Sequence, residues 1–202
     1  HTANRRQRQM CIRDRNIYAL ECLNSFAGGT ISWLKDNLKL INKAEDSEVL
    51  SKKEKDSNGV YLIPAFSGLG PPFWISNARA AFFGISASTN NNHLVRAGLE
   101  SVAYQVVVYL EFMKKSRNLD LKNLSIDGGM VKNKFFLQII SNLLEIELNI
   151  PEMEDMSSYG ALLFGMQYYH NLKNTTGLND FKVKNSKITV SYTHLTLPTI
   201  RS

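Results

Sequence analysis

Two consecutive glycines, Gly128 and Gly129, stand between a predicted strand over 124–126 and a predicted helix that begins near Phe135. In open α/β sheets, ligands bind at the carboxyl ends of the strands. The free N–H groups at a helix N-terminus suit a phosphate, and glycine, which has no Cβ, lets a flat nucleoside lie against the backbone. Asn133 follows four residues later and could hydrogen-bond a base or a ribose. The pattern leaves two interpretations open, a nucleotide site and a plain tight turn.

A second glycine pair, Gly28 and Gly29, falls in the first turn of a helix predicted over 26–41, where apolar residues follow the 3.6-residue period. Glycine lowers the helix propensity of such a turn. The pair indicates either a loose start to the helix or a close approach of the backbone to a ligand. Spacing alone favours the loose start.

Other common catalytic patterns are absent from the sequence. His93 and His170 stand far apart, and no pair of cysteines has the spacing of a metal site. No Gly-x-Ser-x-Gly motif marks a serine nucleophile. Glu100 and Gln105 are polar residues in an apolar helix, where such side chains more often bridge neighbouring loops than perform chemistry. The glycine pairs therefore remain the candidates for a functional site.

The elements around Gly128 and Gly129 must position them. These elements alternate between strand and helix, as in an α/β domain. Strands and helices alternate in the last third of the chain, over 124–126 (strand), 135–144 (helix), 146–150 (strand) and 157 to about 172 (helix). This order predicts parallel strands joined by right-handed crossovers. Ser157 or Ser158 is the expected cap of the last helix.

The preceding part of the chain supplies further elements. Residues 93–117 predict a long helix that is apolar nearly all round, and therefore buried, with Asn91 or Asn92 as its cap. The polar residues 42–58 have no apolar periodicity and predict an exposed excursion. Two short apolar strands flank a loop rich in glycine and proline, over 60–66 and 80–85.

The composition is that of a globular protein. The chain has 202 residues, of which 44% are hydrophobic and 21% are charged, so disorder, collagen and a disulfide scaffold are excluded. No apolar run approaches the ~20 residues that a membrane-spanning helix needs. The net charge of +6 would favour a nucleic acid or an anionic membrane as partner, if the charge were spread over the folded domain.

Both ends of the chain look like translations of one transposase sequencing adapter. One reading frame of this oligonucleotide encodes residues 190–199, and its reverse complement encodes residues 5–14. We therefore predict adapter-derived tails at 1–15 and 190–202, and a domain truncated at both ends over 16–189. Such tails have no core to pack against and are expected to lie exposed or poorly ordered.

The predicted tails carry most of the net charge. Residues 1–15 have a net charge of +4 and residues 190–202 of +1, which leaves +1 for residues 16–189. Nucleic-acid binding thereby loses its main support. Cys22 is the only cysteine in 16–189, which favours a reducing, cytoplasmic compartment over a disulfide framework.

Several segments of the sequence resemble the C-terminal domain of the FGGY carbohydrate kinase family. Residues 60–74 read VYLIPAFSGLGPPFW, residues 78–85 read ARAAFFGI and residues 93–104 read HLVRAGLESVAY. Ala80-x-Phe82-x-Gly84-Ile85, seven residues, then His93-Leu94-x-x-Ala97 fits the second signature of the family, and Gly98 departs from it where a larger residue is usual. The segment 67–74 has the form found in the glycerol kinases of the family. The resemblance covers nearly all of 16–172.

The resemblance implies an α/β, actin-like (ribonuclease H-like) ATPase domain, with a mixed sheet, flanking helices and ATP in an interdomain cleft. Gly28, Gly129 and Asn133 match positions that contact the adenine nucleotide in the family, and Ser32 stands where many members have a glutamine that contacts it. Gly129 is expected to adopt a conformation, or to approach the ligand so closely, that a Cβ would be obstructed. No residue is assigned as catalytic or as a metal ligand, since the family's base lies upstream of this sequence. Asp127 is expected to cap the glycine loop.

The resemblance also implies a function. The expected reaction is transfer of the γ-phosphoryl group of ATP, with Mg²⁺, to glycerol to give glycerol 3-phosphate. The expected full-length protein is a cytoplasmic homo-oligomer that binds glycerol and ATP, with no nucleic-acid partner and no membrane span, and this fragment alone is expected to be inactive. Two alternatives remain: another FGGY polyol or sugar kinase, and a non-catalytic nucleotide-binding member of the fold.

Overall fold

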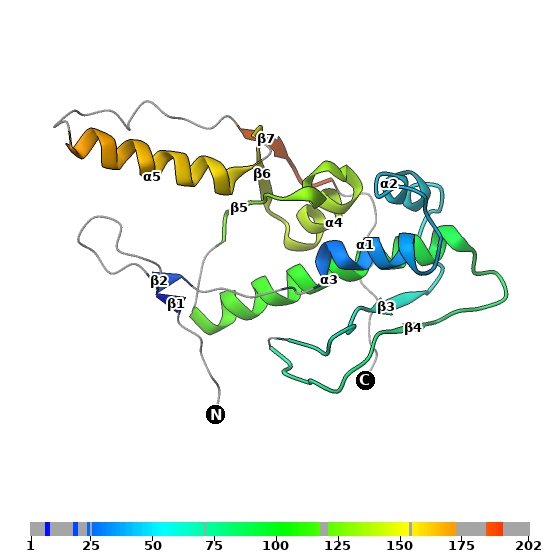
Figure 1. Cartoon of the computed structure of the whole chain (residues 1–202). Helices are drawn as coiled ribbons and strands as arrows, with labels where there is room; N and C mark the ends of the chain where they lie inside the picture. The colour runs from blue at the N-terminus through cyan, green and yellow to red at the C-terminus, as the bar shows by residue number, and fades with distance from the viewer. Residues whose placement is uncertain are drawn as a thin grey trace. The chain divides into compact units, whose positions relative to one another are not determined.

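The computed structural model describes residues 7–8, 18–19, 24, 26–70, 72–117, 121–153, 155–172 and 185–191. The chain divides into two compact units, residues 1–120 and residues 121–202, and each is described by itself. Figure 1 shows the helices and strands of both units in chain order. The candidate residues are divided between them, with Gly28 and Ser32 in the first unit and Gly129 and Asn133 in the second.

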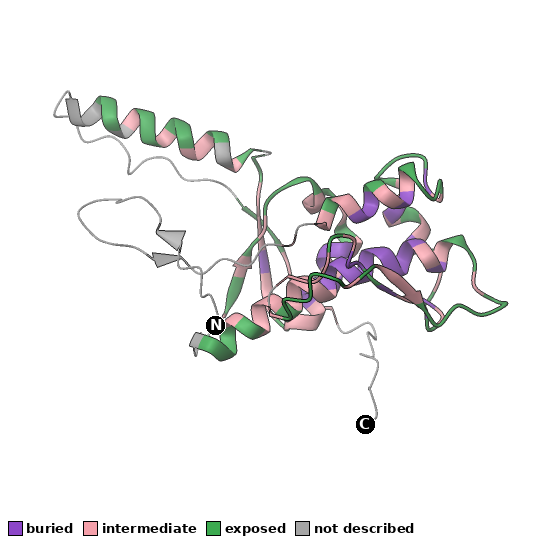
Figure 2. Cartoon of the chain, turned by 60° about the horizontal axis from the view of Figure 1, so that its bottom comes forward, coloured by how far each residue is buried: buried purple, intermediate pink, exposed green. Residues whose placement is uncertain are grey.

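The first unit is organised around α3 (Asn91–Arg117), the long helix that the sequence predicts. The elements that pack against α3 are α1 (Ala27–Asp36), α2 (Asp46–Ser51) and β3 (Tyr61–Ile63). β3 pairs antiparallel with β4 (Ala81–Phe83). Buried residues concentrate on the first half of α3 (Figure 2). The largest fully buried aliphatic side chains of this unit are Leu34, Val60, Val95, Leu99 and Val102.

α1 and α3 approach each other closely at Gly98. A Cβ placed on Gly98 would lie 2.6 Å from Cδ1 of Leu34, far closer than carbon atoms pack. Leu34 is fully buried on α1 and occupies the space that a larger residue at position 98 would need. The unusual glycine at this position is therefore matched by the leucine on the neighbouring helix.

α1 is shorter than its apolar periodicity predicts, because it ends at Asp36 rather than near Ile41. Lys39 has a φ of 55°, which no helix can continue through. Ile41 is nevertheless only 4% exposed. Ile41 is therefore buried although it lies beyond the end of α1, and the apolar period of the sequence continues past the helix.

The segment 42–58 is not the simple exposed excursion that its polarity predicts, since it contains α2. The Asp46 carboxylate accepts hydrogen bonds from the N–H groups of Asn42 and Lys43, at 3.1 and 2.9 Å. Ser47 and Ser51 of α2 are buried, and α2 packs on α3. Small polar residues leave no apolar period, which is why the sequence pattern missed this helix.

The cap of α3 is Asn90 rather than Asn91 or Asn92. Its Oδ1 accepts a hydrogen bond from the His93 N–H at 3.2 Å, and His93 Nδ1 accepts one from the Asn90 N–H at 3.1 Å. This reciprocal arrangement is a capping box in which histidine takes the place of the usual glutamate or glutamine. The predicted type of cap is correct, and its position is one residue earlier.

The second unit contains a three-stranded mixed sheet in the order β5–β6–β7. β5 (Asn123–Ser125) pairs parallel with β6 (Glu147–Pro151), as predicted. Between these strands run the short 3₁₀ helix η1 (Gly129–Lys132) and α4 (Lys134–Leu144), which buries Phe136, Leu137, Ile139 and Ile140. β6 also pairs antiparallel with β7 (Asn185–Ile188), whose mostly polar residues gave no strand signal.

α5 (Met156–Leu172) follows β6, and its cap is Asp155 rather than Ser157 or Ser158. The Asp155 Oδ1 accepts a hydrogen bond from the Ser158 N–H at 2.9 Å. Several large apolar side chains of α5 are exposed, namely Leu162, Phe164, Tyr168 and Tyr169.

Most of the two predicted tails lies outside the described residues. Within 1–15 only β1 (Gln7–Arg8) is described, and it pairs antiparallel with β2 (Tyr18–Ala19). Within 190–202 only residues 190 and 191 are described, and the Ser191 N–H donates to Asn142 Oδ1 at 2.8 Å. The adapter origin of the tails stays a prediction. None of the helices in the described part of the chain is long and apolar enough to cross a membrane.

Candidate functional site

The glycine loop follows the carboxyl end of β5, as the sequence predicts. Ile126 N–H still bonds to the Asn149 carbonyl of β6 at 3.0 Å, and the loop leaves the sheet directly after it. The Asp127 Oδ1 accepts a hydrogen bond from the Gly128 N–H at 2.7 Å. This contact agrees with the capping role expected for Asp127.

The unusual backbone conformation belongs to Gly128 and not to Gly129. Gly128 has φ 103° and ψ 176°, a region open almost only to glycine. Gly129 is not among the residues with positive φ, and a Cβ built on it meets no atom within 4 Å. The conformational part of the prediction for Gly129 is therefore corrected, while its exposed, open backbone leaves room for a ligand.

Asn133 has a structural role that the sequence did not predict. It is the N-cap of α4, and its Oδ1 accepts a hydrogen bond from the Phe136 N–H at 2.9 Å. The cap fixes where η1 ends and where α4 begins, so it also fixes the path of the glycine loop between β5 and α4. Substitutions at Asn133 will change both the helix and any ligand contact.

Removal of the Asn133 cap should destabilise the protein. Asn133→Ala should lower the free energy of unfolding by about 1 kcal/mol, because the Phe136 N–H loses its acceptor. Asn133→Ser keeps a capping oxygen and should retain most of that stability. Thermal unfolding followed by circular dichroism compares the two variants. Equal melting temperatures for Asn133→Ala and the unsubstituted chain would contradict the assignment of the cap.

Gly28 and Ser32 lie together on the exposed face of α1. They are four residues apart, so their positions follow one another along one side of the helix, and both are exposed. A Cβ on Gly28 meets nothing within 4 Å, whereas one on Gly29 would lie 2.8 Å from the ring of Phe26. Gly29 therefore serves packing, and Gly28 leaves the first turn of α1 open on its outer side.

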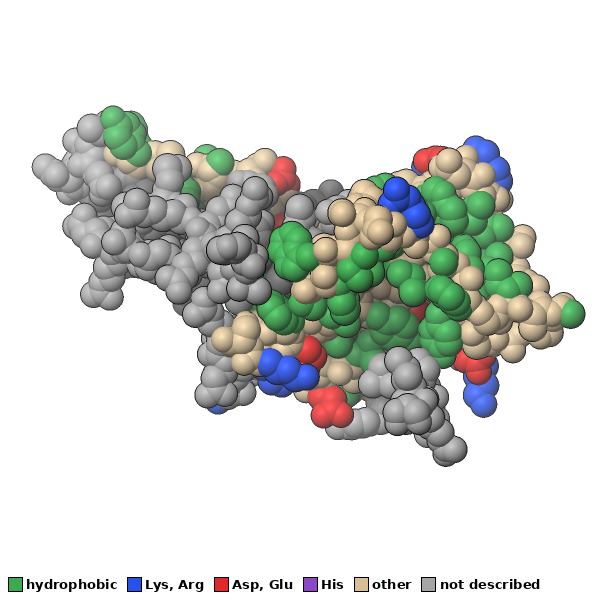
Figure 3. Space-filling model, turned by 90° about the horizontal axis from the view of Figure 1, so that it is seen from below, with side chains coloured by type: hydrophobic (Ala, Val, Ile, Leu, Met, Phe, Trp, Pro, Cys, Tyr) green, Lys and Arg blue, Asp and Glu red, His purple; other side chains and the backbone are tan. Residues whose placement is uncertain are grey.

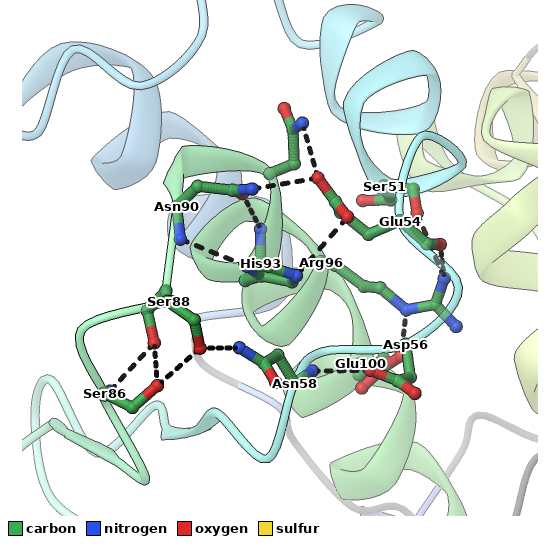
Figure 4. Close-up of polar contacts among 12 residues, drawn as sticks. Ser51, Glu54, Asp56, Asn58, Ser86, Ser88, Asn90, His93, Arg96 and Glu100 are labelled. Atoms are coloured by element: carbon green, nitrogen blue, oxygen red, sulfur yellow. Dashed lines mark hydrogen bonds and ion pairs between the residues drawn. The ribbon is translucent and has the colours of Figure 1, made fainter.

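A polar cluster at the N-terminal end of α3 was not predicted as a unit. We call it the Arg96 cluster, formed by Ser51, Glu54, Asn90, His93, Arg96 and Glu100 (Figure 4), together with Asn92, which donates to Glu54 Oε1. The Arg96 Nε donates to Glu100 Oε1 at 2.7 Å, and its Nη1 donates to the carbonyl oxygens of Ser51 and Glu54 at 3.1 and 2.7 Å. The cluster ties the end of α2 and the loop after it to α3.

Two glutamates of the Arg96 cluster have pKa values shifted in opposite directions. Burial raises the pKa of Glu100 above its ordinary value, and the hydrogen bond and charge of Arg96 oppose that shift. Hydrogen bonds from Asn92 and Asn90 lower the pKa of Glu54, with smaller contributions from the charges of His93 and Arg96. The charged form of the buried Glu100 carboxylate therefore depends on Arg96.

The central ion pair of the Arg96 cluster is buried and links α3 to the segment that follows α2. Arg96 is 7% exposed and Glu100 is 4% exposed. A charged pair at i and i+4 inside an otherwise apolar helix was the available sequence signal. Glu100 was expected to bridge to a neighbouring loop; its carboxylate bonds to Arg96 on the same helix, and Arg96 is the residue that reaches the neighbouring segment.

The sequence profile of the C-terminal domain of the FGGY family of carbohydrate kinases matches residues 9–168 of the chain. Glycerol kinases from Citrobacter koseri and from Salmonella arizonae are each 45% identical to it over 158 residues. That match covers 77% of this chain and 32% of each relative, so the chain spans about a third of the length of the curated relatives it matches.

Solved structures give the same picture of the fold. The crystal structure of Plasmodium falciparum glycerol kinase with ADP matches with a TM-score of 0.67 and 34% identity, over 76% of this chain and 30% of that one. A ligand-bound xylulose kinase from Lactobacillus acidophilus matches with a TM-score of 0.67 but 17% identity, over 81% of this chain and 33% of that one. These neighbours confirm the predicted α/β, actin-like fold class.

Proposed function

The chain belongs to the FGGY family of carbohydrate kinases, and from that premise we propose that it is the C-terminal part of an ATP-dependent glycerol kinase. The observation that carries this proposal is the difference in sequence identity between two groups of relatives. The chain is far more similar in sequence to glycerol kinases than to the xylulose and gluconate kinases that share its fold. The form of the segment 67–74 supports the same substrate.

The proposed reaction is a phosphoryl transfer. An oxygen of glycerol forms a bond to the γ-phosphorus of ATP, the bond from that phosphorus to the bridging oxygen breaks, and ADP leaves. The proton of the attacking hydroxyl passes to a carboxylate base, which we expect in the part of the relatives that this chain does not cover. Within this chain we assign no catalytic residue.

We propose that four residues of this chain bind the nucleotide, namely Gly28, Ser32, Gly129 and Asn133. Gly28 and Ser32 offer the open outer side of α1, and Gly129 offers exposed backbone after β5. The absence of a Cβ at both glycines allows a flat nucleoside to approach the main chain. We propose that Asn133 both caps α4 and contacts the nucleotide. Serine at position 32 reaches less far than the glutamine common in the family, so its contact would need a bridging water.

We propose that Mg²⁺ accompanies the ATP and that its ligands come from outside this part of the protein. The described residues contain no group of three or more His, Cys, Asp or Glu side chains placed to hold a metal ion. Phosphate oxygens and residues of the longer protein are the ligands that we propose for it. The role left to this chain is to hold the nucleotide that carries the ion.

The test is a comparison of two polypeptides. A polypeptide of the full family length, carrying this domain, should release ADP in a coupled assay with glycerol and not with xylulose or gluconate. The present chain should show no glycerol-dependent ADP release above background, because the proposed base is missing. Turnover by the present chain would overturn the proposal. Preference of the long form for a sugar would favour another FGGY kinase, and ATP binding without turnover would favour a non-catalytic member.

Three further features complete the proposal. The adapter-derived tails would be 1–15 and 190–202, with the truncated kinase domain over 16–189. The cytoplasm is the proposed compartment, supported by the single cysteine of that range. Assembly into a homo-oligomer is the expectation from the family, and light scattering of the full-length protein would test it.

A further inference from the structure

The sequence contains a single Asn-Gly pair, Asn58 and Gly59, in the tight turn that leads into β3. Both residues have positive φ, 52° for Asn58 and 72° for Gly59. The Val60 N–H closes the turn with a hydrogen bond to the Ser57 carbonyl at 3.0 Å. Positive φ at both central positions is typical of an Asn-Gly turn. Neither Asn58 nor Gly59 belongs to the proposed nucleotide site.

An asparagine that precedes glycine can react with its own main chain. The nitrogen of the next residue forms a bond to Cγ of the asparagine, the bond from Cγ to the amide nitrogen breaks, and ammonia leaves. Water then opens the five-membered imide at one of its two carbonyl carbons, which gives aspartate or isoaspartate. The reaction needs no reactant except water. A side chain on the next residue slows the reaction by shielding the attacking nitrogen, and glycine has none.

The attacking nitrogen of this reaction is accessible in the structure. Gly59 is exposed, and because it has no side chain, the exposed surface is that of its main chain. Within the part of the chain that the structure describes, the Gly59 N–H donates no hydrogen bond. Its nitrogen can therefore lose a proton to solvent and attack without first leaving a partner.

The Asn58 side chain, in contrast, is held by the neighbouring loop. Its Nδ2 donates a hydrogen bond to Ser88 Oγ at 2.9 Å, and Ser88 Oγ lies 2.9 Å from Ser86 Oγ (Figure 4). Nδ2 is the atom that leaves as ammonia, so the bond to Ser88 is lost in the reaction and opposes it. We propose that Asn58 is a site of spontaneous deamidation through Gly59, and that the hydrogen bond to Ser88 restrains this reaction.

Deamidation would change both the charge and the main chain of the turn. The Asn58 N–H donates to the Asp56 carboxylate at 2.8 Å, so a carboxylate at position 58 adjoins another one. Isoaspartate adds one carbon to the main chain, and the turn has no room for it, since the Gly59 carbonyl fills the space beside Gly84. Val60 is fully buried, and its displacement would add to the hydrophobic side chains gathered on one face of the molecule (Figure 3). The deamidated chain should therefore melt at a lower temperature.

Incubation of the whole chain at pH 8, followed by peptide mass spectrometry, measures the conversion of amide to acid at each asparagine. Asn58 should convert before Asn77 and Asn123, which are exposed but precede alanine and leucine. Ser88→Ala removes the restraint and should speed conversion at Asn58 about threefold, the factor expected for one exposed hydrogen bond. Ser116→Ala removes an exposed serine at the other end of α3 and should leave the rate unchanged.

A second variant connects the reaction to stability. Asn58→Gln keeps an amide but lengthens the side chain, so its imide ring would have six members and would form slowly. After the same incubation, circular dichroism should show a lower melting temperature for the unsubstituted chain and not for Asn58→Gln.

Three results would overturn the proposal. The first is conversion at Asn58 no faster than at Asn77 and Asn123, and the second is an equal rate at Asn58 in Ser88→Ala and Ser116→Ala. The third is equal acceleration of all three asparagines in Ser88→Ala, because a general loosening of the fold would then explain the rate.

Discussion

Replacement of Arg96 by alanine is expected to lower the free energy of unfolding of the first unit by about 3–5 kcal/mol at pH 8. The substitution leaves the Glu100 carboxylate buried without its cation, and it removes the donor to the carbonyl oxygens of Ser51 and Glu54. Both tryptophans of the chain, Trp33 and Trp74, lie in the first unit. Urea unfolding followed by tryptophan fluorescence therefore reports on the unit that Arg96 holds together.

The loss of unfolding free energy in Arg96→Ala should depend on pH, and the protonation of Glu100 sets the direction of that dependence. Its pKa is already raised by burial, and it should rise further in Arg96→Ala because the opposing effect of Arg96 is gone. A carboxyl whose folded pKa exceeds its unfolded pKa takes up a proton more readily when folded, so its cost falls as the pH is lowered. Arg96→Ala should therefore be less destabilised, relative to the unsubstituted chain, at pH 5 than at pH 8.

Two controls separate this explanation from a general loss of charge. Adding Glu100→Gln to Arg96→Ala removes the buried charge and should recover part of the stability and most of the pH dependence. Lys114→Ala breaks an exposed pair with Glu111 on the same helix and should change the stability little. A pH-independent loss in Arg96→Ala would show that packing, rather than the unpaired carboxylate, carries the effect.

The second large effect concerns the glycine loop, where adjacent glycines should respond in different ways. Gly128→Ala should cost about 1–3 kcal/mol of folding free energy, since its φ of 103° and ψ of 176° suit glycine almost alone. Gly129→Val should leave the melting temperature nearly unchanged, because the position is exposed and has open space around it. In the full-length kinase, however, Gly129→Val should weaken ATP binding at least tenfold, since a branched side chain would occupy the space proposed for the nucleoside.

Circular dichroism melts of both variants and isothermal titration of the full-length variants with ATP make the comparison. The important result is the dissociation of the two effects, with stability lost at position 128 and affinity lost at position 129. Unchanged ATP affinity in Gly129→Val would mean that the loop is only a turn. A stable Gly128→Ala variant would contradict the backbone conformation described for that residue.

Elements with strong apolar patterns were predictable from the sequence. Apolar residues marked α4, β6 and the length of α3 in the sequence, although burial in α3 is concentrated on its first half. α2 and β7 were missed for the converse reason. Ser47 and Ser51 are buried in α2 without being apolar, and the residues of β7 are mostly polar. Their stability comes from neighbours distant in sequence, which a local pattern does not record.

The sequence by itself determined the family and the strand-loop-helix order around the glycine loop, because those features depend on residue type and short spacing. The resemblance to the family, rather than spacing, proposed the candidate residues at 28, 32, 129 and 133. Only the tertiary structure decided the structural role of each residue. It assigned the glycine-only conformation to Gly128, the cap of α4 to Asn133, and the outer side of α1 to Gly28 and Ser32. It also joined Arg96 to carbonyl oxygens 45 and 42 residues away. Backbone angles, exposure and contacts between distant segments depend on how the elements pack, and packing is a property of the whole fold rather than of any one stretch of sequence.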